Sequence, residues 1–184
     1  DFLAYSRGNQ YQFASVDLLP LLEDTLTLLE HRLVADKTGI RIDRQYNFKQ
    51  ALTSPHGDKI KQVFWNFWEN AVRAMSSGGV LRVSLEQVED DWQINFADTG
   101  PGMSRQLVEK IFEPFQSQFE GGTGLGLAIV YQIVQAHEGK VWARSRVGEG
   151  SVFVLRLRRT TAEENVPLKR PAAKPQLLPE TGRT

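Results

Sequence analysis

Hydrophobic side chains recur at helical spacing in three long segments of the chain. Leucine is the repeating residue in the first, aromatic and aliphatic residues share a stripe in the second, and the third is almost continuously apolar. Such a spacing of three and four residues predicts α-helices. Asp17 or Ser15 is placed to cap the first helix, and Ser104 caps a fourth, shorter one. The predicted helices span residues 16–36, 58–75, 104–112 and 125–136.

Other segments alternate between apolar and polar residues, which predicts strands. Two pairs of strands are separated by short turns, at residues 89–91 and 148–150, and each pair is expected to form a hairpin. The strands are predicted at residues 40–46, 81–85, 92–96, 141–145 and 152–157. Strands that pair with one another, with helices gathered on one face, describe an α+β fold of two layers.

Composition narrows the range of functions. The 184 residues include 22 basic and 22 acidic ones, so no broad basic face for nucleic acid is indicated. The absence of cysteine excludes disulfides and thiolate metal sites. No apolar run approaches the roughly 20 residues that span a bilayer, and a cytoplasmic location is expected, with membrane attachment of a longer parent left open. From Thr160 onward the composition is that of a linker or tail.

The second predicted helix carries a polar row beside its apolar stripe. Asn66, Asn70 and Arg73 are spaced by four and three residues and therefore project from neighbouring positions on one side of the helix. Asparagine is unfavourable inside a helix because its side chain competes for backbone hydrogen bonds. One interpretation is a set of amide oxygens and a guanidinium that face a metal-phosphate group. The alternative is a solvent-exposed polar face.

Two glycine-rich segments follow strands or precede helices. Asp98–Met103 (DTGPGM) comes directly after a predicted strand, where an aspartate is placed to accept a hydrogen bond from an exocyclic amine; a Pro-Gly turn is the alternative. Gly121–Leu127 (GGTGLGL) runs into the third long helix, whose free N–H groups suit polyphosphate; a flexible loop is the alternative. The second segment is neither a P-loop nor a dinucleotide fingerprint, because the spacing differs.

Four motifs follow one another in a characteristic order. In that order they resemble the N, G1, F and G2 boxes of the catalytic domain of sensor histidine kinases, of the nitrogen-regulation type in particular. The resemblance covers roughly residues 16–158 and implies the Bergerat ATP-binding sandwich, a mixed sheet covered on one face by about three helices, which gyrase, mismatch-repair and heat-shock-chaperone ATPases share. The motifs are Asn66–Ala71, Asp98–Gly102, Phe112–Phe115 and Gly122–Leu127.

The resemblance implies a site for ATP and Mg²⁺. Asp98 would hold the adenine amine, while Asn70, together with Asn66, would coordinate Mg²⁺. These two asparagines and Arg73, which would contact phosphate, are the expected catalytic residues, since phosphoryl transfer depends mainly on positioning and charge neutralisation. The other residues expected to bind nucleotide are Gly100, Gly102, Met103, Phe115, Gly122, Thr123, Gly124, Leu125 and Gly126.

The resemblance also divides the chain. Residues 1–14 are expected to end a dimerisation and phosphoacceptor helix, residues 15–159 to form the catalytic domain and residues 160–184 to form a linker or tail. None of His31, His56 and His137 lies in an acceptor motif. The expected acceptor is therefore a histidine on a separate dimerisation domain of the same kinase, with a response regulator as an indirect partner. The chain itself is expected to be monomeric.

A departure from the family pattern at Phe119, and a fold shared with other ATPases and kinases, keep other functions open. Phe119 occupies the position where related kinases often carry a lysine that touches phosphate, so a non-enzymatic nucleotide-sensing module is one alternative. A gyrase-type hydrolytic ATPase is another, although such enzymes usually place a glutamate where this chain has Asn66. A serine kinase of the anti-sigma type shares the fold, but the segment Phe112–Phe115 argues against it.

Overall fold

A computed structural model describes residues 15–53, 57–116 and 123–160 of the chain. The predictions made for residues 1–14, for His56, Phe119 and Gly122, and for the tail beyond Thr160 lie outside these residues.

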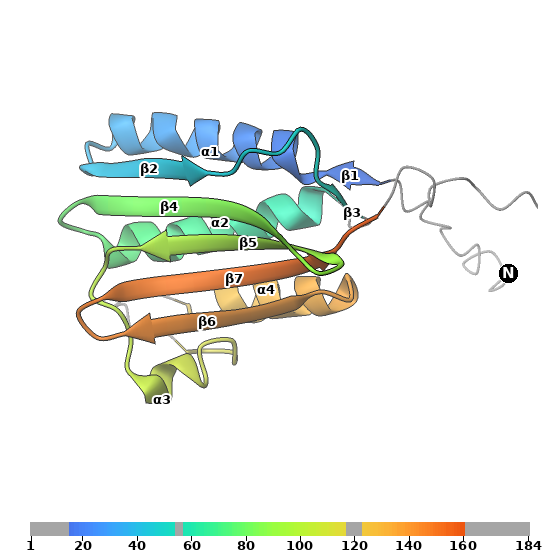
Figure 1. The fold of residues 1–184 in the computed structure, drawn as a ribbon. Coiled ribbons are helices and arrows are strands. Elements are labelled where there is room, and N and C mark those ends of the chain that lie inside the picture. The colour runs from blue at the N-terminus through green and yellow to red at the C-terminus, as the bar shows by residue number, and fades with distance from the viewer. Residues whose placement is uncertain (1–14, 54–56, 117–122, 161–184) are drawn as a thin grey trace, which may run out of the picture.

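A mixed five-stranded sheet forms one layer of the molecule (Figure 1). The strand order is β2-β4-β5-β7-β6, with β2 and β4 parallel and the other neighbours antiparallel. The predicted hairpins β4–β5 and β6–β7 are confirmed. The strands are β2 (Ile40–Gln45), β4 (Gly79–Val88), β5 (Asp91–Asp98), β6 (Lys140–Arg146) and β7 (Gly150–Arg158).

Three long helices form the second layer, on one face of the sheet (Figure 1). They are α1 (Leu18–Ala35), α2 (Gly57–Ala74) and α4 (Gly126–Ala136), each within two residues of its predicted bounds. Asp17 caps α1: its Oδ1 accepts hydrogen bonds from the N–H groups of Leu19 and Ala51, at 3.1 and 2.9 Å. The predicted α+β sandwich is confirmed.

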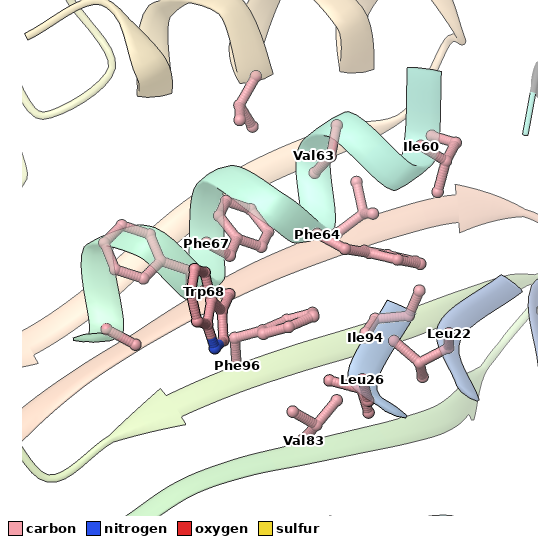
Figure 2. Close-up of a cluster of buried hydrophobic side chains, with 14 of the residues drawn as sticks. Leu22, Leu26, Ile60, Val63, Phe64, Phe67, Trp68, Val83, Ile94 and Phe96 are labelled. Atoms are coloured by element: carbon pink, nitrogen blue, oxygen red, sulfur yellow. The ribbon is translucent and has the colours of Figure 1, made fainter. Parts of the chain in front are cut away.

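The core lies between the layers and centres on α2 (Figure 2). Phe64 and Phe67 are fully buried, and their rings lie 5.7 and 5.5 Å from the ring of Phe96 on β5. Phe67 also stacks on Phe153 of β7 at 5.4 Å. Full burial of such a side chain contributes about 1.5–3 kcal/mol. The apolar stripe of α2 therefore fixes the rotation of this helix, and with it the direction of the polar row.

The short helix differs from its prediction. Ser104 is the N-cap as expected, its Oγ accepting from the N–H of Leu107 at 3.3 Å, but α3 (Arg105–Val108) ends four residues early. Beyond it the N–H of Glu113 bonds to the carbonyl of Lys110, three residues back, at 2.8 Å. Pro114 disfavours the helical conformation only at Glu113, so it limits any continuation of the helix beyond residue 112.

A small second sheet was not predicted. Strands β1 (Val16–Asp17) and β3 (Leu52–Thr53) pair antiparallel, and Thr53 bridges to Arg159 after β7. Strands of two residues are too short to show a period in the sequence. This sheet ties the start of α1 to the end of β7 at the edge of the domain opposite Asp98.

Candidate active site

An open cleft, about 720 Å³ with the solvent space at its mouth included, lies between α2, α4 and the ends of β5 and β7. It is lined by residues from α2, the segments around Asp98 and Ile111, the start of α4 and the start of β7. Those anticipated from sequence are Asn66, Asn70, Arg73, Asp98, Met103, Thr123, Gly124 and Gly126. Residues as far apart in sequence as Asn66 on α2 and Phe153 on β7 therefore meet in one pocket.

Two asparagines on α2 present their amide oxygens to this cleft. The Nδ2 group of Asn66 donates to the carbonyl of Gln62, and that of Asn70 donates to the carbonyl of Asn66, each at 2.8 Å. Since each amide nitrogen is engaged by the helix backbone, Oδ1 is the atom of each of these cleft-lining side chains that remains for a ligand. Both asparagines are half-buried. The helix thus offers two oriented oxygen ligands one turn apart.

The amino end of α4 faces the same asparagines. A Cβ added at Gly126 would lie 2.6 Å from Oδ1 of Asn66, so the glycine allows this close approach. Leu125 is the N-cap and provides no side-chain hydrogen bond. The N–H groups of Gly126, Leu127 and Ala128 make no hydrogen bond with another described residue. Unsatisfied donors at the positive end of a helix dipole suit an anion.

Arg73 adds a positive charge to this end of the cleft. Its side chain is exposed and forms no ion pair with any residue in the described part of the chain. Glu69, one turn earlier on α2, also lines the cleft. Glu69 was not among the site residues predicted from the sequence.

The other end of the cleft is built around Asp98, which is only 6% exposed. Its Oδ1 accepts hydrogen bonds from the N–H groups of Gly100 at 2.9 Å and Ser151 at 3.3 Å. Burial raises the pKa of the Asp98 carboxyl above its ordinary value, and these N–H donors partly oppose the rise. Since both donors use Oδ1, the second oxygen remains for a ligand in the cleft.

The loop after Asp98 is fastened to the β6–β7 hairpin. The N–H of Met103 bonds to Oγ of Ser145 at 2.8 Å, and the N–H of Gly148 bonds to the carbonyl of Pro101 at 2.7 Å. Gly102 has a φ of +70° and lies so close to the carbonyl of Arg146 that a Cβ would overlap it. This glycine therefore shapes the loop from outside the cleft.

Several expected residues lie beside the cleft and do not line it. Gly100 and Gly102 act through the backbone of the loop, and Leu125 is 38% exposed. Phe115 is 78% exposed; its N–H bonds to the carbonyl of Gly124 at 2.9 Å, which holds the two sides of the loop together. The lining residues that sequence reasoning missed are Glu69, Ala74, Ile111, Gln116, Leu127, Ser151 and Phe153.

Ser151 is the most informative of the missed residues. It is 5% exposed, lines the cleft and donates its N–H to Asp98. The sequence signal was present, because Ser151 directly follows the glycine-rich turn of the last hairpin. What the sequence did not show is that β7 pairs with β5 in a register that sets Ser151 opposite Asp98.

Comparison with known proteins decides the family. A family model described as "Histidine kinase-, DNA gyrase B-, and HSP90-like ATPase" matches residues 56–161, which is more than half of the chain. The chain belongs to this family.

Individual relatives agree with this assignment. The signal transduction histidine-protein kinase AtoS of Escherichia coli is 36% identical over 156 residues, covering 83% of this chain and 25% of the relative. The chain spans about a quarter of the length of the curated relatives that it matches. The catalytic domain of histidine kinase ThkA superimposes with a TM-score of 0.72 at 28% identity, covering 84% of this chain and 99% of that domain. ThkA in complex with the response regulator TrrA gives a TM-score of 0.68 at 26% identity, covering 80% and 42%.

This domain is accordingly a catalytic domain of the histidine kinase type, with the fold that the four boxes predicted. The narrower assignment to the nitrogen-regulation type stays a prediction. Among the described residues no helix is both long and apolar enough to cross a membrane. Within the same residues no cluster of three or more His, Cys, Asp or Glu side chains forms a metal site.

The residues of the cleft fit a magnesium nucleotide. Mg²⁺ prefers oxygen ligands, keeps several waters and is held partly by phosphates, so two amide oxygens suffice from the protein. Asn66 and Asn70 would supply those oxygens, since their amide nitrogens are already engaged by the helix backbone. Gly126 leaves open, beside Oδ1 of Asn66, the space that a side chain would fill.

Proposed function

We propose that this domain binds Mg-ATP and transfers the γ-phosphoryl group to a histidine on a separate dimerisation domain of the same kinase. One observation carries the proposal. A single cleft is lined by a buried carboxylate and also by two asparagines, an arginine and the start of α4, whose first N–H groups make no hydrogen bond with another described residue. These two sets of groups match the two ends of a nucleoside triphosphate.

At the buried end, Asp98 receives the adenine amine. Oδ1 is occupied by backbone donors, and the remaining oxygen accepts a hydrogen bond from the amine. Met103 and Ile111, both nearly buried, line the same cleft and supply apolar surface for the base. A charge-assisted hydrogen bond inside a buried site is worth about 1.5–3 kcal/mol.

At the open end, Asn70 and Asn66 hold Mg²⁺, which neutralises charge on the phosphates when it is bound. Arg73 contacts one phosphate oxygen, and the first N–H groups of α4 donate hydrogen bonds to another. Every one of these groups is a ligand or a donor, and none is an acid or base. The protein therefore acts by positioning the triphosphate, which is the main requirement of phosphoryl transfer.

The reaction balances without a proton donor in this domain. A neutral histidine ring has one nitrogen with a free lone pair, and this nitrogen attacks the γ-phosphorus. A phosphorus–nitrogen bond forms, the bond to the bridging oxygen breaks with its electron pair leaving on ADP, and the proton on the other ring nitrogen is released to solvent. Asn66 favours this outcome over hydrolysis, because an amide cannot deprotonate water.

An apolar surface beside the mouth of the cleft suits the acceptor domain. Phe115 is 78% exposed, and Leu125 and Ile129, one helical turn apart on α4, are each 38% exposed. Phe115 and Leu125 flank Gly124, which lines the cleft. A helix of the dimerisation domain that covered these side chains would bring its histidine to the phosphate end. The response regulator then takes the phosphoryl group from that histidine, in the cytoplasm.

Hydrolysis is the competing function, and Glu69 is the observation that favours it. This glutamate lines the cleft one residue before Asn70 and has a carboxylate that could activate water. Under the proposal Glu69 does not act as a base. If the isolated chain released phosphate steadily, and Glu69→Gln abolished this release, the result would support ATP hydrolysis in place of the proposed phosphoryl transfer.

The proposal is tested by mixing the chain with the dimerisation domain of its kinase and ATP labelled at the γ-phosphate. Label is expected on the dimerisation domain, to be lost when its acceptor histidine is replaced by glutamine, and absent from His31 and His137 of this chain. Binding of ATP without any transfer would leave only a nucleotide-sensing module. Labelling of the chain's own histidines at a normal rate would contradict a separate acceptor.

A further inference from the structure

A row of three polar residues crosses three strands at the buried end of the cleft. Asp98 on β5 lies opposite Ser151 on β7, and Ser151 lies opposite Ser145 on β6. Residues directly opposite one another in a sheet project from the same face. Asp98 and Ser151 line the cleft, whereas Ser145, one strand further on, does not. Nothing in the proposed chemistry so far uses Ser145.

The hydroxyl of Ser145 has its hydrogen-bonding capacity filled by three partners. Its Oγ accepts from the N–H of Met103 at 2.8 Å, donates to the carbonyl of Gly150 at 2.7 Å and lies 3.0 Å from Oγ of Ser151. A hydroxyl has one proton and two lone pairs, and a carbonyl only accepts. Since the proton of Ser145 lies on the bond to Gly150, Ser151 must be the donor in the bond between the two serines.

This direction determines what Ser151 shows to a ligand. Its only hydroxyl proton points at Ser145, so its Oγ faces the cleft with lone pairs. The neighbouring Asp98 carboxylate also accepts and does not donate. The wall that meets the purine 6-position is therefore made of acceptors alone, and Ser151 and Asp98 are both at least nine-tenths buried.

We propose that Ser145 is a positioning residue that selects a 6-amino purine over a 6-oxo purine by fixing the proton of Ser151. The inference rests on the proposed ATP function. An amino group brings two N–H donors to this wall and satisfies it. A 6-oxo group brings only lone pairs, so the buried acceptors of the protein face another acceptor. A site built to accept hydrogen bonds from a ligand discriminates strongly against a ligand that lacks the donor. Without Ser145, the hydroxyl of Ser151 is free to rotate and donate to the oxo group.

The test compares the binding of Mg-ATP and of Mg-ITP, whose hypoxanthine base carries oxygen at the 6-position, by titration calorimetry on the 184-residue chain. In Ser145→Ala the preference for ATP over ITP is expected to fall about tenfold relative to the unsubstituted chain. Ser145→Thr keeps the hydroxyl and is expected to retain the preference within about twofold. A loss of fold or of loop position would instead weaken both nucleotides together.

A second arm isolates the route through Ser151. Ser151→Ala removes the hydroxyl whose proton is being directed, so adding Ser145→Ala to it should not change the ATP-to-ITP preference further. The inference is overturned if Ser145→Ala keeps the original preference, if it weakens both nucleotides by one factor, or if its effect persists beside Ser151→Ala. An unsubstituted chain that binds neither nucleotide overturns the proposed function and this inference together. Binding with an unchanged preference overturns the inference alone.

Discussion

The two ends of the cleft are built in different ways. The base end joins the loop after β5 to the β6–β7 hairpin, and Asp98 and Ser151 there are buried and bonded to backbone groups. The phosphate end is a set of side chains on α2 that face the start of α4, with Arg73 exposed and without a partner among the described residues. The residues of the base end also hold the strands and the loop together, whereas the residues of the phosphate end are side chains whose contacts the fold does not depend on.

The difference predicts how each end responds to substitution. A change at the base end removes a recognition group and also alters contacts that hold strands and loop together. A change at the phosphate end leaves the core of α2, with Phe64 and Phe67, as it was. Substitutions at the base end should therefore change stability according to the buried charge they remove and the backbone contacts they keep, whereas substitutions at the phosphate end should leave stability unchanged.

Asp98→Asn is expected to give the largest loss of binding. The new Oδ1 keeps the bonds from Gly100 and Ser151, so the amide nitrogen meets the adenine amine, donor against donor. Mg-ATP affinity should fall about 100-fold, or about 2.7 kcal/mol. Calorimetric titration measures this, with Asp91→Asn on the same strand as the matched control. Binding reduced less than about threefold would show that Asp98 does not hold the base.

The same substitution also measures how the buried charge of Asp98 affects the free energy of unfolding, independently of nucleotide binding. Burial raises the pKa of Asp98, so the folded state holds this proton more tightly than the unfolded chain does. The stability of the unsubstituted protein relative to Asp98→Asn should fall as the pH rises through that pKa. Urea unfolding from acidic to neutral pH should find Asp98→Asn at least as stable at pH 7. A clear loss of stability at pH 7 would contradict this account of the base end.

Asn70→Ala is expected to remove the metal-dependent part of binding. Affinity for Mg-ATP should fall about 30-fold, or roughly 2 kcal/mol, whereas affinity for ATP in the presence of EDTA should not change. Alanine also favours helix, so the unfolding midpoint should not fall. Gln62→Ala, on an exposed position of the same helix, is the control. An equal loss with and without metal would place Mg²⁺ elsewhere.

Gly126→Ala tests the fit between the two helices. The new Cβ would meet Oδ1 of Asn66 at 2.6 Å, and moving that side chain breaks its bond to Gln62. Mg-ATP affinity is expected to fall about tenfold while helix propensity, and thus the unfolding midpoint, rises or stays level. Unchanged binding would mean that Asn66 is not held in place by this contact.

Arg73→Ala should have the smallest effect. The guanidinium is exposed, so solvent and salt screen it, and a loss of about threefold is expected at low ionic strength. The difference from the unsubstituted chain should vanish as salt is raised, and Arg73→Lys should recover most of the affinity. A large loss that does not depend on salt would indicate that Arg73 acts inside a closed site.

Sequence predicted the phosphate end better than the base end, for a physical reason. Asn66, Asn70 and Arg73 belong to one helix, whose period alone places them together. The glycine-rich segment that precedes α4 indicates polyphosphate binding from its sequence alone. Ser151 and Ser145 reach the base end only through strand register, which becomes visible once β5, β7 and β6 are paired.

Two other differences follow from side-chain direction. Phe115 and Leu125 were expected to bind nucleotide, but both side chains are solvent-exposed and neither lines the cleft. Glu69 belongs to no residue pattern that the sequence singles out, yet it lines the same cleft. A motif fixes positions along the chain, whereas the helix rotation that packing imposes decides which side chains face a ligand.

A crystal structure of the chain with Mg²⁺ and a non-hydrolysable ATP analogue tests the central claim most directly. The account predicts the adenine amine at hydrogen-bonding distance from Asp98, the metal bound by Oδ1 of Asn70, and the phosphates at the amino end of α4. A nucleotide whose base lies away from Asp98, or whose metal and phosphates do not touch α2, would contradict it.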